Sequence, residues 1–102
     1  MQSRSTGILF TQYFRPDGKT EPVTIHLPEI QRQADELLAL GYRFECEVLR
    51  TNEASFTIIH PARESEGDLA IEVVPNGPEV PAAVTRLIRN FYDKLLTQPR
   101  SG

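Results

Sequence analysis

The sequence predicts an α+β domain of two layers, in which two helices cover one face of a five-stranded, mainly antiparallel sheet. Two observations predict this class. Five short segments alternate apolar with polar residues, as strands with one buried face do. Two longer segments repeat apolar residues at helical spacing, and they come third and last along the chain. The expected order of elements is therefore ββαβββα.

The first two expected strands form a hairpin. Residues Ile8 to Phe14 alternate without an internal glycine or proline. The turn Arg15-Pro16-Asp17-Gly18 combines a proline that pre-sets φ with a glycine that accepts a positive φ. The second strand, at about residues 23–27, alternates in the same way. Pro22 has no N–H to donate, which predicts that this strand lies at an edge of the sheet.

The third element is expected to be a helix from about Pro28 to Leu40. Its apolar residues recur every three or four positions, and Gly41 supplies a stop at its C-terminal end. Its other face is polar, with Glu29 in the first turn, where the helix dipole favours negative charge. This two-sided pattern predicts a helix that packs on the sheet with one face in solvent.

Three more strands are expected after this helix, at about residues 42–48, 54–59 and 69–73. The first of them alternates most regularly and turns Cys46 toward the core. Residues 61–68, between the last two strands, are expected to form a charged, solvated loop. The three strands would form a meander.

The last helix, at about residues 80–95, has a rigid start. It follows the stretch Val74-Pro75-Asn76-Gly77-Pro78-Glu79-Val80-Pro81. Proline suits the first helical turn, so Pro78 and Pro81 are expected there, with Asn76 and Gly77 at the cap or turn before it. Free N–H groups at a helix start can bind an anion, although the same residues can serve only to begin the helix.

We expect one domain over residues 8–96, with flexible tails at 1–7 and 97–102. If the first strand lies between the second and the third, the strand order is 2-1-3-4-5. A crossover through the first helix would then leave all neighbouring strands antiparallel.

The sheet face away from the helices would be polar and charged. It would present Tyr13, Arg43, Glu45, Glu47 and Glu72. Thr57 and Ile59 would join them there, because Phe56 and Ile58 compete for the core.

Composition limits the function. The chain has 102 residues, 39% of them hydrophobic and 25% charged, which is typical of one soluble globular domain. Its formal charge of −3 is too small to favour nucleic-acid binding or a strongly acidic mimic of DNA. The single Cys46 excludes an internal disulfide and favours a reducing, cytoplasmic setting. No segment approaches the roughly 18 apolar residues of a membrane span, so we expect no membrane partner.

No complete catalytic motif is present in the sequence. It lacks a phosphate-binding glycine-rich loop with lysine, a nucleophile elbow and paired metal-ligand spacing, so we expect no enzyme, no cofactor and no metal. His26, His60 and Cys46 could in principle converge as metal ligands. Their separate strands and the inward direction of Cys46 argue against such a site.

Three carboxylates, those of Glu45, Glu47 and Glu72, could share the outer sheet face. Crowded carboxylates can have raised pKa values that suit acid or base work. Arg43 nearby would neutralise them, so a solvated or partner-binding face explains this pattern better than catalysis.

Four segments also carry a family resemblance. They are Phe10-Thr11-Gln12-Tyr13 with Arg15-Pro16-Asp17-Gly18, Gly41-Tyr42-Arg43-Phe44-Glu45, Ala70-Ile71-Glu72, and Pro75-Asn76-Gly77-Pro78-Glu79-Val80-Pro81. Together, over nearly the whole domain, they resemble a group of small uncharacterised proteins encoded by phages and prophages. The resemblance implies an accessory protein acting in the cytoplasm of an infected bacterium, and it supplies no functional residue.

Two functions follow as hypotheses. The first is a non-enzymatic, homodimeric interaction protein that binds and inhibits a host protein, since open edge strands and one uncovered sheet face invite pairing. The second is binding or sequestering of a small anionic, nucleotide-like ligand by the Asn76 and Gly77 N–H groups at the start of the last helix, with Arg15 or Arg43 supplying positive charge. The candidate binding residues are Tyr13, Arg15, Arg43, Glu45, Glu72, Asn76, Gly77 and Glu79.

Overall fold

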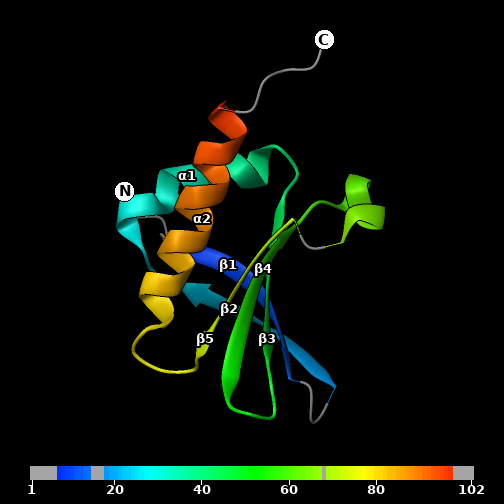
Figure 1. Ribbon diagram of the computed structural model, residues 1–102, viewed down its shortest axis with the longest axis vertical. Coiled ribbons are helices and arrows are strands. Elements are labelled where there is room, and N and C mark those ends of the chain that lie inside the picture. The colour runs from blue at the N-terminus through cyan, green and yellow to red at the C-terminus, as the bar shows by residue number, and fades with distance from the viewer. Residues whose placement is uncertain (1–6, 15–17, 68, 98–102) are drawn as a thin grey trace, which may run out of the picture.

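The computed structural model describes residues 7–14, 18–67 and 69–97. Its elements are β1 (Ile8–Phe14), β2 (Lys19–Ile25), η1 (Pro28–Ile30), α1 (Gln31–Ala39), β3 (Arg43–Val48), β4 (Glu53–Ile59), η2 (Pro61–Glu66), β5 (Ala70–Pro75) and α2 (Val80–Thr97), where η denotes a 3-10 helix. The predicted order ββαβββα is confirmed (Figure 1). β2 begins four residues earlier than expected, and η2 forms where a loop was expected.

The five strands form one sheet in the predicted order β2-β1-β3-β4-β5. β1 pairs with β2, β3 with β4, and β4 with β5 in antiparallel fashion, but β1 and β3 are parallel, with Thr11 opposite Glu45. The expectation that all neighbours are antiparallel was therefore wrong. The nine residues of α1 rise about 14 Å, less than the roughly 20 Å spanned by the seven-residue strands β1 and β2. The chain therefore re-enters the sheet at the end where β2 left it.

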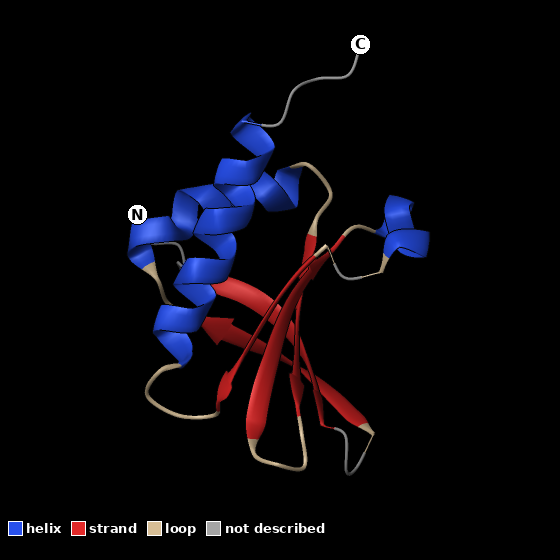
Figure 2. Cartoon of the chain, viewed as in Figure 1, coloured by secondary structure: helices blue, strands red, loops and turns tan. Residues whose placement is uncertain are grey.

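Both helices pack on one face of the sheet and close the core between the two layers (Figure 2). Phe10 of β1 lies near its centre, with its ring centroid 5.5 Å from those of Phe44 and Phe56 on β3 and β4. Leu37 of α1 and Ile88 of α2 are fully buried in the same core and close it from the helical layer. The predicted two-layer α+β class is thus confirmed.

The start of α2 differs in one detail from the expectation. The helix begins at Val80, so Pro81 is in its first turn as predicted, whereas Pro78 precedes the helix. The Val80 N–H donates to the Gly77 carbonyl at 3.1 Å and closes a tight turn, in which Pro78 takes the position that proline prefers. Among the described residues, no helix is long and apolar enough to cross a membrane.

Candidate functional site

The helices leave one face of the sheet uncovered, called the open face below. By strand alternation it carries Thr20, Pro22 and Thr24 from β2, Leu9, Thr11 and Tyr13 from β1, Arg43, Glu45 and Glu47 from β3, Ser55, Thr57 and Ile59 from β4, and Ile71 and Val73 from β5. Phe56 and Ile58 point the other way and are buried in the core. The predicted position of Thr57 and Ile59 on this face is therefore confirmed.

Three of the predicted binding residues share the open face, on the adjacent strands β1 and β3. The Tyr13 hydroxyl of β1 donates a hydrogen bond to Glu45 Oε2 of β3 at 3.3 Å. Desolvation by burial, and then the negative charge of Glu45, raise the pKa of Tyr13 above its ordinary value. Arg43 lies two residues before Glu45 and shares its face. Two adjacent strands of this face therefore present a phenol and a carboxylate that share a hydrogen bond, and a guanidinium at the start of β3.

Glu72 lies on the covered face of the sheet, beneath α2. It stands opposite Phe56 in the pairing of β4 with β5, and Arg86 of α2 donates to its Oε2 at 2.7 and 3.1 Å. The expectation that Glu72 lies on the open face was therefore wrong. Its neighbours Ile71 and Val73 take the open face instead, where they are 54% and 51% exposed. A carboxylate can face the helical layer here because Arg86 neutralises it.

A hollow of about 330 Å³ lies at the end of the open face where β1 and β3 begin. Its lining residues are Leu9, Thr11, Leu38, Arg43, Phe44, Glu45, Ile59 and Pro61. The Leu9 side chain is 55% exposed and the Leu38 side chain, from α1, is 38% exposed. This hollow is therefore open to solvent, with apolar walls and both signs of charge beside them. We call it the Leu9 hollow.

Sequence reasoning missed the Leu9 hollow. Alternation along β1 places Leu9 outward between the buried residues Ile8 and Phe10, but it does not show that Leu38 of α1 borders the same hollow. Leu38 directly follows the buried Leu37 along the helix. The available signal was the presence of apolar residues on both faces of one strand, which a half-buried strand does not need.

The predicted residues at the start of α2 lie at the far end of the sheet from Arg43. The Asn76 N–H donates to the Asn52 carbonyl at 3.0 Å, which places this segment beside the turn between β3 and β4. Arg43 stands opposite Ile59, at the other end of β4. Seven strand residues separate these two ends, or roughly 20 Å. The structure does not bring Arg43 and Asn76 together.

The other candidate residues described near this helix start supply no positive charge. Gly77 and Glu79 are exposed next to Asn76, and the carboxylate of Glu79 would repel an anion. Arg15 lies outside the described residues. The Asn76 N–H is already used by Asn52, so fewer donors remain at this helix start than the sequence suggested.

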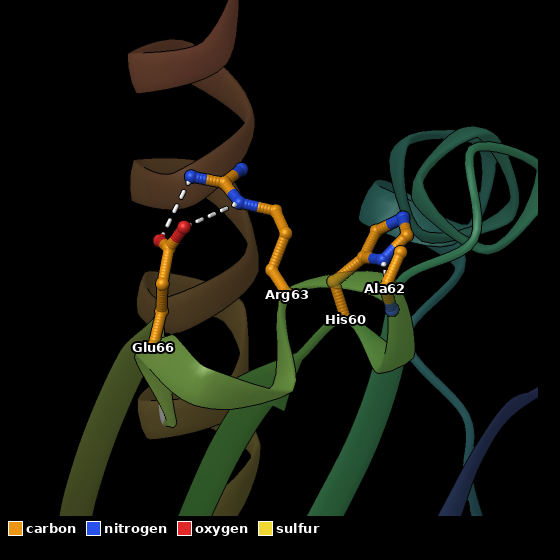
Figure 3. Close-up of polar contacts among 4 residues, drawn as sticks. All are labelled: His60, Ala62, Arg63 and Glu66. Atoms are coloured by element: carbon orange, nitrogen blue, oxygen red, sulfur yellow. Dashed lines mark hydrogen bonds and ion pairs between the residues drawn. The ribbon is translucent and has the colours of Figure 1, made fainter.

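The segment after β4 is held in place by His60 (Figure 3). Its Nδ1 accepts a hydrogen bond from the Ala62 N–H at 3.1 Å, and its Nε2 lies 3.1 Å from the Leu40 carbonyl oxygen. The neutral ring with its proton on Nε2 satisfies both contacts. One turn further, Arg63 Nη2 pairs with Glu66 Oε1 at 2.9 Å. His60 therefore joins the start of η2 to the end of α1.

Cys46 is 5% exposed and faces the core, as predicted. Desolvation by burial, together with the charge of Glu47, raises the pKa of its thiol to about 11. The thiol is therefore protonated at neutral pH and is a poor nucleophile. Within the described ranges, no group of three His, Cys, Asp or Glu side chains is placed to hold a metal ion.

Comparisons with protein-family models, with curated proteins and with solved structures found no match for this chain. The resemblance to phage and prophage proteins therefore stays a prediction from the sequence. The function has to be argued from the geometry of the open face.

Proposed function

We propose that this protein is a non-enzymatic interaction protein that binds a partner protein through the Leu9 hollow of its open face. One observation carries the proposal: a hollow of about 330 Å³ whose apolar walls include side chains as exposed as Leu9, at 55%. Exposed apolar side chains around a concavity are typical of a binding surface, because covering them releases water.

The residues of the hollow indicate the chemistry of the partner. Leu9, Leu38 and Ile59 would surround an apolar side chain inserted from the partner, in the manner of a binding hot spot. Arg43 beside them can pair with a carboxylate on the partner. We therefore expect a partner segment that presents an aliphatic or aromatic residue next to an acidic one. Following the resemblance, the expected partner is a bacterial host protein that this binding inhibits.

Binding of a small anionic ligand is the weaker candidate. It needs positive charge near the start of α2, whereas Arg43 is roughly 20 Å away along β4. It also needs free N–H groups, and that of Asn76 already donates to Asn52.

The test compares the wild-type protein with Leu9→Asp and with Leu96→Asp. Both leucines are exposed, at 55% and 68%, but Leu96 lies near the end of α2 and does not line the hollow. Partners captured from a bacterial lysate are identified by mass spectrometry, produced recombinantly and measured by calorimetry. We expect Leu9→Asp to weaken binding at least about tenfold and Leu96→Asp to leave it unchanged. Equal binding by Leu9→Asp and the wild type would contradict the proposal.

A further inference from the structure

The outer edge of β5 is a second surface with the properties of a binding site. Among the residues that the structure describes, β5 is the last strand of the sheet and pairs with β4 alone. The backbone N–H and C=O groups on the free side of an edge strand are a template for another extended strand. The opposite edge, β2, contains Lys19, Glu21 and Pro22, residues that discourage such pairing. β5 has no lysine, and its only proline, Pro75, is its last residue.

A groove runs beside this edge. It has a volume of about 200 Å³ and is lined by Leu69, Ala70, Ile71, Glu72, Leu87, Asn90, Phe91 and Lys94, so it lies between β5 and α2. On the open face, Ile71 and Val73 are more than half exposed at the same edge. An added strand would therefore cover apolar side chains on one face and meet the groove on the other.

We propose that the strand that fills this edge is β5 of a second copy, paired antiparallel across a twofold axis so that the two sheets become one. Such an interface is isologous, because each copy offers the same strand to the other. This proposal goes beyond the proposed function: the dimer uses the β5 edge and leaves the Leu9 hollow free, so either can fail without the other.

The register of this pairing follows from side-chain chemistry. A twofold axis perpendicular to the sheet places one residue of β5 opposite its own copy. If Glu72 lay on the axis, its carboxylate would face the carboxylate of the second copy. If Val73 lay on the axis, Pro75 would fall within the paired region, although it has no N–H to donate. With Ile71 at the axis, two isoleucines meet on the open face, and Glu72 stands opposite Ala70 of the partner. We therefore infer the register centred on Ile71.

This register also matches charge. Both hydrogen bonds from Arg86 go to Oε2 of Glu72, which leaves Oε1 able to accept another. Glu72 of one copy would lie beside Ala70 of the other, at the groove that Lys94 lines. Each interface would thus contain two pairings of a Glu72 carboxylate with the partner's Lys94 ammonium, related by the twofold axis.

The first test is sedimentation of the full-length protein at micromolar concentrations, where we expect a dimer. Ile71→Lys would place two like charges opposite each other and should raise the dissociation constant at least about tenfold. The fold should tolerate this change because Ile71 is 54% exposed. Thr24→Lys is the matched control, since Thr24 is exposed on the open face of the β2 edge; it should leave the dimer intact.

The second test examines the register by cross-linking. Under mild oxidation, Ile71→Cys should form a disulfide-linked dimer, because directly opposed residues on paired strands lie about 5 Å apart at Cβ. Val73→Cys should not, since the two copies would be about 13 Å apart along the strands. The natural Cys46 is buried and does not compete. A monomer at all these concentrations, a dimer unaffected by Ile71→Lys, or preferential cross-linking through Val73→Cys would each overturn the proposal.

Discussion

The two edges of the sheet are protected to different degrees. β2 relies on its own sequence: Lys19 and Glu21 are exposed charges, and Pro22 removes a backbone donor. β5 has no lysine and no proline before its last residue, and α2 packs only on its covered side, where it supplies Arg86 to neutralise Glu72. A helix that covers one face of an edge strand therefore stabilises the strand but leaves its outer backbone N–H and C=O groups free.

The same difference appears in burial. On the side that faces the helices, β5 buries Val74 at 4% exposure, whereas Val23 of β2 is only half-buried. β2 is therefore held mainly by its pairing with β1, whereas β5 also contributes a side chain to the core. Three substitutions with matched controls measure this difference, with successively smaller expected effects.

The largest effect is expected from Gly41→Ala, at the contact that fixes the connection leading to β5. Gly41 has a φ of +102°, and a Cβ added there would lie 2.7 Å from His60 Nε2. Backbone strain together with loss of the His60 contact should lower the free energy of unfolding by about 3 kcal/mol. Urea unfolding monitored by circular dichroism measures this loss.

Gly18→Ala is the control in the turn that leads to β2. Gly18 also has a positive φ, of +70°, but a Cβ there would meet nothing within 4 Å. We expect a loss of only about 1 kcal/mol. Equal losses for the two variants would show that the contact with His60 contributes nothing.

An intermediate effect is expected when one valine in each edge strand is truncated to alanine. Val74→Ala should cost about 2 kcal/mol, because it removes buried methyl groups and leaves a cavity under α2. Val23→Ala should cost less than about 1 kcal/mol, since solvent already reaches that side chain. Urea midpoints of the two variants give the comparison directly. A larger loss for Val23→Ala would mean that β2 belongs to the core after all.

The smallest effect is expected from Glu72→Gln. The ion pair with Arg86 is partly exposed, with side-chain exposures of 26% for Glu72 and 56% for Arg86, so its loss should cost about 0.5 kcal/mol. The cost should shrink as salt is added, because salt screens such pairs. Glu21→Gln on β2 is the control and should change stability less. A cost that does not depend on salt would assign the effect to packing instead of charge.

The sequence predicted the fold well where pattern and local chemistry agree. The helical spacing before Gly41 and the proline-rich segment before Val80 placed both helices, and Pro22 correctly placed β2 at an edge. The parallel pairing of β1 with β3 was missed because it depends on how far α1 carries the chain across the sheet. The alternation of buried and exposed residues does not show whether two neighbouring strands run parallel or antiparallel.

The candidate site was predicted only in part. Tyr13, Arg43 and Glu45 do share the open face, because β1 and β3 alternate unambiguously. β5 is apolar on both sides of Glu72, so its sequence fits either orientation. The observed orientation is stabilised by the ion pair of Glu72 with Arg86, which lies 14 residues away in the sequence and on another element. Which face an edge strand presents is thus a tertiary property that local alternation cannot determine.

The parallel pairing of β1 with β3 has a consequence for how the chain folds. Thr11 and Glu45 are 34 positions apart, whereas the residues paired in the other strand pairs are at most 22 positions apart, as Glu53 and Pro75 are. Closing a longer loop costs more chain entropy and slows folding. The hairpin of β1 with β2 and the unit from β3 to α2 can each form from local contacts. We therefore expect their docking along β1 and β3 to be the slow step of folding.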